Sequence, residues 1–398
     1  MKLYFIFFTL VTRSALAADF QVSKITEKGI KQIDIHATDT ASKTDDPEKS
    51  ISAVEAKRAT IPWAKSRWPK LAEKENIKIV MIGDSGCRLK EGKVKSEYQD
   101  CKDPKAWPFP DIMKHIGEEK ADLVIHVGDY HYRENCSKGK PCEKMSSVIG
   151  YTWDPWEKDF FTPASEVLKS TPWIIVRGNH EDCNRAYLGY AHLLANDDFS
   201  KKCLEYEEPD YIQLKNLLIV NLDSSMAPDI IDIDKDNQET WVKRFDDIAQ
   251  KVKETKAEKV WIVTHKPFYG LVKLGPMVAP TNVNLKKYFE VSKLKGKVEL
   301  ILSGHVHLSQ IIKSHDAPLQ FVLGNGGTEM DKFVEVLETA KLKLLELDSA
   351  QIENPGFGYA VFEKNEKAKS WSVHFKNEKG NLVSACTFKS STGTCEKN

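Results

Sequence analysis

The sequence has no excess of charge of either sign and, after its first residues, no long apolar run. Lys and Arg number 58 and Asp and Glu also number 58, so the formal net charge is zero. This balance argues against the basic surface by which proteins bind nucleic acid. Beyond residue 17 no stretch approaches the roughly 20 apolar residues of a membrane-spanning helix. We therefore expect a soluble mature protein that neither binds nucleic acid nor spans a membrane.

The N-terminus carries the pattern of an export signal. Met1-Lys2 gives a positive start, Leu3 to Thr12 is apolar, and Ala15-Leu16-Ala17 supplies the small residues that a signal peptidase reads. The apolar part is too short to span a bilayer. We predict a signal peptide over residues 1–17 and an exported protein, either periplasmic or secreted.

The chain also lacks any Cys-x-x-Cys motif, which disfavours a zinc thiolate site as the use of its cysteines. An even number of cysteines in an exported chain indicates disulfides. The eight cysteines fall into local groups that predict the pairs Cys87–Cys101, Cys136–Cys142, Cys183–Cys203 and Cys386–Cys395.

Alternating strands and helices predict α/β layers for most of the chain. The expected core strands are residues 77–82, 123–127, 173–176, 217–223, 259–263, 298–302 and 320–323. We assign residues 75–350 to a catalytic domain and residues 351–398 to a β-rich C-terminal segment. Residues 18–74 form an N-terminal extension, in which 21–25 and 31–35 alternate like strands and the polar stretch 38–58 is expected to be a linker or mobile segment.

Polar side chains follow five of these predicted strands. Any one of them alone is usually a turn former, but the ends of parallel strands meet at one edge of a sheet, and their joint placement there favours a common site. Carboxylates, an amide, a phenol and imidazoles combine hard oxygen ligands with borderline nitrogen ligands. They could hold two metal ions with Asp129 between them. The residues are Asp84; Asp129 with Tyr132; Asn179 with His180; His265; and His305 with His307.

At these residues the chain resembles the calcineurin-like metallophosphoesterases and, within them, the purple acid phosphatases. The five motifs stand at Gly83–Gly86, Gly128–Tyr132, Gly178–Glu181, Ile262–His265 and Gly304–His307. Only the first position of the fourth motif departs, with Ile262 in place of Val. The continuation Tyr132-Arg133-Glu134 is similar to that of exported bacterial metallophosphatases. The resemblance implies a layered β-sandwich flanked by helices.

The resemblance also implies two ligand sets. The first, of ferric type, consists of Asp84, Asp129, Tyr132 and His307. The second, for Zn(II), Mn(II) or Fe(II), consists of Asp129, Asn179, His265 and His305. Most of the superfamily has a His ligand where this chain has Gly86, and the phenol of Tyr132 can replace it. A phenolate favours Fe(III), although a loop aromatic that packs on the core is the simpler alternative for Tyr132.

The implied activity is a phosphomonoesterase of acid phosphatase type acting on a small-molecule phosphate ester. Two adjacent cations neutralise phosphate oxygens and lower the pKa of a bridging water, whose hydroxide attacks phosphorus. His180, beside Asn179, is expected to protonate the leaving alkoxide. Arg133 stands where protein serine/threonine phosphatases hold phosphate, which suggests a bidentate contact, with an ion pair to Glu134 as the alternative.

Three other functions stay open for the same set of residues. A phosphodiesterase or nucleotidase, or a protein phosphatase, would use the same metals, because the metals do not define the ester. An exported binding module with a vestigial site would be expected to have lost at least one ligand. The complete set in this chain argues against that reading.

Overall fold

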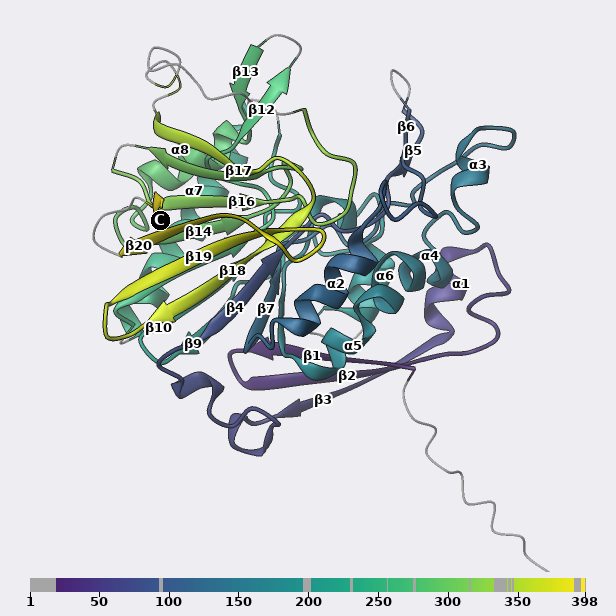
Figure 1. Cartoon of the computed structure of the whole chain (residues 1–398), viewed down its shortest axis with the longest axis horizontal. Coiled ribbons are helices and arrows are strands. Elements are labelled where there is room, and N and C mark those ends of the chain that lie inside the picture. The colour runs from purple at the N-terminus through teal and green to yellow at the C-terminus, as the bar shows by residue number, and fades with distance from the viewer. Residues whose placement is uncertain are drawn as a thin grey trace, which may run out of the picture.

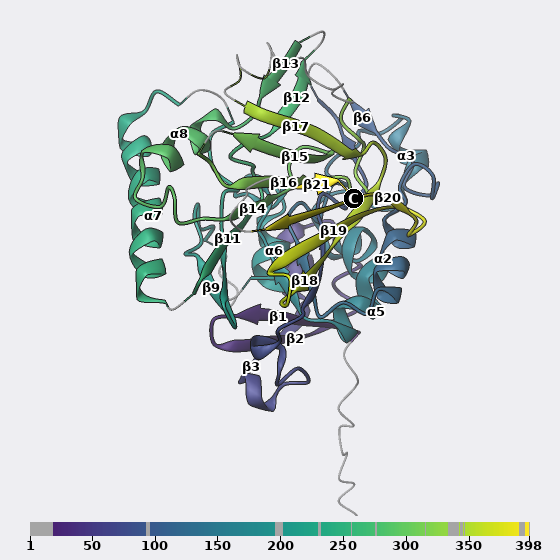
Figure 2. The same ribbon diagram turned by 60° about the vertical axis from the view of Figure 1, so that its left-hand side comes forward.

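The computed structural model describes residues 19–92, 96–195, 202–229, 232–255, 257–274, 277–314, 316–332, 342, 345, 347–389 and 395–397. The predicted signal peptide lies outside these residues. Two sheets face each other and helices cover their outer faces (Figures 1 and 2). No helix within the described ranges combines the length and apolar character needed to cross a bilayer.

The larger sheet has ten strands in the order β21-β20-β19-β18-β4-β7-β8-β1-β2-β3. Its centre is formed by parallel strands β4 (Lys78–Ile82), β7 (Leu123–His126) and β8 (Trp173–Ile175). The smaller sheet has seven strands in the order β17-β15-β16-β14-β11-β10-β9. Its parallel strands are β10 (Leu217–Leu222), β11 (Lys259–Thr264), β14 (Leu300–Ser303) and β16 (Leu319–Leu323). All the predicted core strands are therefore present.

Alternating side chains of each strand build two different cores, because successive residues point to opposite faces of a sheet. In β4, Ile79 and Met81 pack between the sheets, where they join Trp261 of β11. Val80 and Ile82 face the other way, toward helices α2 (Phe109–Glu118) and α5 (Thr162–Ser170). Helices α7 (Lys235–Glu254) and α8 (Val283–Val291) cover the smaller sheet in the same manner. The predicted layered sandwich flanked by helices is confirmed.

The N-terminal residues belong to the larger sheet. Strand β1 (Phe20–Thr26) pairs with β8, and β2 (Gly29–Ala37) and β3 (Val54–Ile61) follow outward. The stretch 38–58, expected to be a linker, instead contains helix α1 (Pro47–Ser52) and much of β3. An edge strand needs few apolar residues, and β3 is held mainly by backbone pairing with β2, so its polar composition misled the prediction.

The C-terminal residues complete both sheets. Strand β17 (Leu347–Asn354) joins the smaller sheet, and β18 (Gly358–Asn365) pairs with β4 in the larger one. Strands β19 (Ser370–Asn377), β20 (Leu382–Lys389) and β21 (Glu396–Lys397) follow. The predicted β-rich C-terminal segment is confirmed, and the proposed domain limits stay predictions.

The remaining strands are β5 (Leu89–Lys90), β6 (Glu97–Tyr98), β9 (Asp210–Leu214), β12 (Leu271–Leu274), β13 (Met277–Pro280) and β15 (Ser309–Ser314). The short helices are α3 (Cys142–Met145), α4 (Trp153–Trp156) and α6 (Tyr187–Leu193).

The disulfides form in the predicted sequential pairing. Their Cα–Cα distances lie between 5.4 and 5.9 Å, within the range of unstrained bridges. Two of the bridges begin just after a motif, since Cys87 follows Gly86 directly and Cys183 comes shortly after Glu181. Both bridges therefore fix loops next to the strand ends.

Candidate metal centre

The polar residues at the strand ends gather at one edge of the sandwich. Parallel strands β4, β7 and β8 bring their carboxyl ends together, and β11 and β14 do the same in the facing sheet. Asp84, Asp129 and His305 adopt left-handed backbone conformations, with φ of 55°, 58° and 70°. Residues other than glycine rarely adopt this region, and such strain is concentrated at functional sites.

The hydroxyl of Tyr132 lies at the centre of one group of donors. It is 2.7 Å from Asp129 Oδ2, 3.1 Å from Asp84 Oδ1 and 3.0 Å from His307 Nε2. Tyr132 is 1% exposed, so its ring is held inside the protein. The four residues of the predicted ferric-type set thus converge on one point.

The amide of Asn179 is the centre of the second group. Its Oδ1 lies 2.8 Å from His265 Nε2 and 2.8 Å from His305 Nδ1. Asp129 Oδ2 lies 3.2 Å from the same His265 nitrogen. Asp129 therefore contacts both groups, which is the arrangement expected of a carboxylate between two ions.

The buried carboxylates of this cluster need positive charge beside them to stay ionised. Asp84 and Asp129 are 0% and 1% exposed. Burial, reinforced by the charge of Asp129, raises the pKa of Asp84 well above its usual value. Burial also raises the pKa of Asp129, but the His265 and His180 imidazoles outweigh it and leave that pKa well below the usual value. Two neighbouring buried carboxylates are stable as anions only beside cations.

The imidazole and phenol respond to the same charges. Burial and the carboxylates of Asp129 and Asp84 raise the pKa of Tyr132 well above its usual value, so a phenolate there requires a strongly charged cation. Burial lowers the pKa of His265, but Asp129 outweighs it and raises that pKa to about 9. A cation that binds His265 must therefore displace a proton at neutral pH.

Steric fit links Gly86 to Tyr132. A Cβ at position 86 would lie 2.7 Å from the backbone nitrogen of Tyr132 and 3.0 Å from its ring Cδ2. Main-chain atoms cannot give way to such contacts, and the carbonyl oxygen of Tyr130 would lie equally close, at 2.8 Å, so only glycine fits at position 86 in this backbone. The Tyr132 ring lies against this glycine.

Main-chain carbonyls orient the imidazoles. His265 Nδ1 lies 2.8 Å from the carbonyl oxygen of Val127, and His307 Nδ1 lies 2.8 Å from that of Glu329. When Nδ1–H donates to a carbonyl, the Nε2 lone pair is left for the cluster. This is the usual support of a metal-binding histidine.

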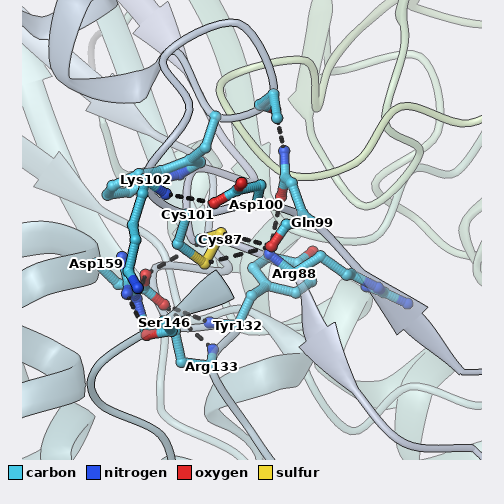
Figure 3. Close-up of a disulfide and its surroundings, with 12 residues drawn as sticks. Cys87, Arg88, Gln99, Asp100, Cys101, Lys102, Tyr132, Arg133, Ser146 and Asp159 are labelled. Atoms are coloured by element: carbon cyan, nitrogen blue, oxygen red, sulfur yellow. Dashed lines mark hydrogen bonds and ion pairs between the residues drawn. A yellow bond between two sulfur atoms is a disulfide. The ribbon is translucent and has the colours of Figure 1, made fainter. Parts of the chain in front are cut away.

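Two buried carboxylates that the sequence analysis did not assign hold the backbone of the site. Glu181 accepts N–H hydrogen bonds of 2.9 to 3.2 Å from Gly178, Asp129, Tyr130 and His131. Asp159 accepts from the N–H groups of Cys87, Tyr132 and Arg133 (Figure 3). The sequence could have pointed to Glu181, because it belongs to the motif Gly178–Glu181. For Asp159 the only hint in the sequence is its position directly before the aromatic pair 160–161.

His180 lies beside the donors and is held by Glu134. Its Nδ1 is 2.7 Å from Glu134 Oε1, and its Nε2 is 3.9 Å from Asp129 Oδ2. Arg185 Nε lies 3.7 Å from the same Glu134 oxygen. Burial outweighs the Asp129 and Glu134 carboxylates and lowers the pKa of His180 to about 4.

Arg133 is placed away from the donors. Its Nε pairs with Asp159 at 2.5 Å and its Nη1 donates to Ser146 at 2.6 Å (Figure 3). Its guanidinium carbon lies 5.0 Å from the Trp107 ring centre. Neither the expected phosphate contact nor the alternative ion pair with Glu134 fits these contacts. The partner of Arg133 is 26 residues distant in the chain, beyond what local sequence indicates.

Comparison with known proteins identifies the family. The sequence profile described as calcineurin-like phosphoesterase matches residues 77–309, more than half of the 398 residues. The chain belongs to the calcineurin-like phosphoesterases. A search of curated proteins gave no match.

Solved structures share the fold of this phosphoesterase at low sequence identity. PhoD superposes with a TM-score of 0.56 and 12% identity, covering 95% of this chain and 91% of PhoD. Purple acid phosphatase PPD1 from yellow lupin (Lupinus luteus) seeds gives 0.50 and 13%, covering 84% of this chain. The chain spans only 56% of the lupin protein's length. These likenesses establish the fold alone.

Metallophosphoesterases of this family bind two metal ions, and the observed donors fit such a site. The ligand atoms of Asp84, Asp129 and His265 lie within 4.8 Å of one another in a buried group. The buried anions, the oriented imidazoles and the space that Gly86 leaves for a phenol all fit resident cations. The chain is accordingly a metallophosphoesterase by family.

Proposed function

We propose that this metallophosphoesterase is an exported phosphomonoesterase of acid phosphatase type with two metal ions. The observation that carries the proposal is the position of the Tyr132 hydroxyl, within 3.1 Å of donor atoms of Asp84, Asp129 and His307. A phenol in that position supplies a hard anionic ligand. The disulfides support export, because such bridges persist in oxidising compartments.

The two donor groups would hold different ions. Asp84, Tyr132 and His307 would hold Fe(III) together with Asp129. Asn179, His265 and His305 would hold Zn(II), Mn(II) or Fe(II), with Asp129 shared. When bound, the ions would neutralise phosphate oxygens and lower the pKa of the attacking water.

The chain's own residues would position the ester and move one proton. The ring of His180 borders the donor cluster, 3.9 Å from Asp129, so a phosphate seated there would bring its leaving oxygen near Nε2. Glu134, 2.7 Å from Nδ1, would orient the ring and favour its imidazolium form. As the imidazolium, His180 would donate its Nε2 proton to the leaving alkoxide. Arg133, engaged with Asp159, takes no part in this proposal.

A paired assay tests the proposal. Metal analysis of the purified protein should give two ions per chain, at least one of them iron. Release of nitrophenol from nitrophenyl phosphate should be much faster than from bis(nitrophenyl) phosphate. Preference for the diester, or for nucleotides or phosphopeptides over simple monoesters, would replace the monoesterase by the corresponding alternative. A fully metal-loaded protein inactive on all these esters would contradict an enzymatic role.

A further inference from the structure

A cavity lies beside the Cys87–Cys101 disulfide. Its volume is about 650 Å³, which falls in the usual range of small-molecule sites. Helices α2 and α5 line it together with the segment that carries Arg133. None of the donor side chains of the metal centre lines it. The cavity is therefore separate from the site of the proposed phosphatase reaction.

A buried guanidinium forms part of the cavity wall. Arg133 is 4% exposed, and Asp159 and Ser146 occupy its Nε and Nη1 (Figure 3). Among the described residues none bonds to its Nη2. The guanidinium carbon lies over the Trp107 ring, 5.0 Å from its centre. This leaves a pre-oriented N–H donor group at the cavity, which suits a planar or tetrahedral anion.

The side chains that line the cavity carry an excess of positive charge. Lys102, Lys114 and Lys158 line it against the single carboxylate of Glu166. The charge of Arg133 is balanced by Asp159, and Lys158 lies 4.0 Å from Glu157, so the excess comes from Lys102 and Lys114. Lys102 donates to a main-chain oxygen, that of Lys144, and so keeps its charge unpaired in that contact. Lys114 has no ion-pair partner in the described part of the chain. The net positive charge favours an anionic occupant.

The remaining lining is largely apolar. Trp107, Pro110, Met113 and Val167 contribute hydrophobic surface. We propose that this cavity binds a small organic anion, with its acidic group at Arg133 and the lysines and its apolar ring or chain against Trp107 and Met113. An inorganic anion would leave the apolar part of the cavity uncovered, so the proposed ligand is amphipathic.

A charged probe and its neutral analogue test the charge requirement. Naphthalene-2-sulfonate should bind the full-length protein at one site in calorimetry, and naphthalene-2-sulfonamide should bind at least tenfold more weakly. Lys114→Gln should weaken binding of the sulfonate roughly two- to fivefold, as expected for one exposed charge. Equal binding of the two probes, or no saturable binding of the sulfonate, would overturn the proposal.

A cavity-filling variant tests the location. Gly117 lines the cavity within α2, and a Cβ there would meet only Val167 Cγ2, at 3.6 Å. Gly117→Leu should therefore fold, fill the cavity and weaken binding of the sulfonate more than tenfold. Gly117→Ala, which adds one carbon, should bind within about threefold of the wild type. Both variants should keep the wild-type rate on nitrophenyl phosphate. Unchanged binding in Gly117→Leu, with a normal melting curve, would place the probe elsewhere and refute the site.

Discussion

The two sheets contribute chemically different halves of the candidate metal centre. The larger sheet supplies oxygen donors, Asp84, Asp129, Tyr132 and Asn179, whereas the smaller sheet supplies nitrogen donors, His265, His305 and His307. Contacts between Tyr132 and His307, and between Asn179 and His265, cross from one sheet to the other. Each proposed ion would bind both halves, so neither sheet alone makes a site.

The halves are also held in opposite ways. Backbone N–H groups point at the oxygen half: His305 N–H donates to Asp84 Oδ2 at 3.0 Å, and His180 N–H donates to Asp129 Oδ1 at 2.8 Å. Backbone carbonyls accept from the nitrogen half, at His265 and His307. Each donor type is thus oriented by the backbone group of complementary polarity.

The largest loss of activity is expected from a substitution at Asp129, which contacts both donor groups. Asp129→Ala should lose both metals and reduce activity by on the order of a thousandfold or more, because ions supply several kcal/mol of transition-state stabilisation. Metal analysis and nitrophenyl phosphate hydrolysis measure both results. Asp84→Ala, which belongs to one donor group, should keep one ion. Two ions per chain in Asp129→Ala would remove the bridging assignment.

Substitution of His180, the proposed general acid, should leave the oxygen and nitrogen donors of the metal centre in place. His180→Asn should retain both metals and lose roughly 10²- to 10⁴-fold in kcat, the usual contribution of general acid catalysis. Glu134→Gln, which weakens the orientation of the ring and removes a charge that favours its protonated form, should lose less, about 10- to 100-fold. A leaving group that needs no proton, such as dinitrophenolate, should restore most of the rate to His180→Asn. Equal loss on both leaving groups would contradict the role as acid.

The carboxylate that supports the oxygen half is expected to matter for stability. Glu181→Gln places amide hydrogens against a pocket of N–H donors, and leaving even one of them unpaired costs about 1–3 kcal/mol of unfolding free energy. Chemical denaturation of the metal-free proteins measures this. Glu118→Gln, on a side chain that is 65% exposed, is the matched control and should change stability by less than about 0.5 kcal/mol. Similar small values for both variants would show that Glu181 is dispensable.

The smallest loss of activity among the oxygen donors is expected at Tyr132. Tyr132→Phe removes one oxygen, so the iron-loaded protein should lose its visible phenolate band and retain its fold. Activity should fall only roughly tenfold, since water can fill the vacated position. Tyr130→Phe is the control, because its hydroxyl donates to the Val176 carbonyl outside the cluster. A band that survives in Tyr132→Phe would falsify the phenolate assignment.

Local patterns sufficed for much of this molecule. Apolar runs that end in Gly-Asp, Gly-Asn-His or Gly-His predicted both the strands and the residues at their ends. Cysteines close in sequence predicted the disulfides, since short loops bring their partners together. The contacts of Arg133 and Glu134 could not be predicted in this way. The two residues are adjacent but point in different directions, and their partners, Asp159 and His180, lie far from them in the chain. The polar strand β3 was missed because backbone pairing stabilises it more than its side chains do.

Residues that are neighbours in the chain, together with strand periodicity, were enough to predict which donors are present, their order along the strand ends and the pairing of the cysteines. The resemblance to the metallophosphoesterases added that Gly86 and Tyr132 stand in place of a histidine. The tertiary structure alone decided that oxygen and nitrogen donors come from opposite sheets, that Glu181 and Asp159 secure the backbone around them, and that Arg133 faces a separate cavity. Those contacts join residues far apart in the chain, and only the packing of the two sheets and their helices brings them within bonding distance.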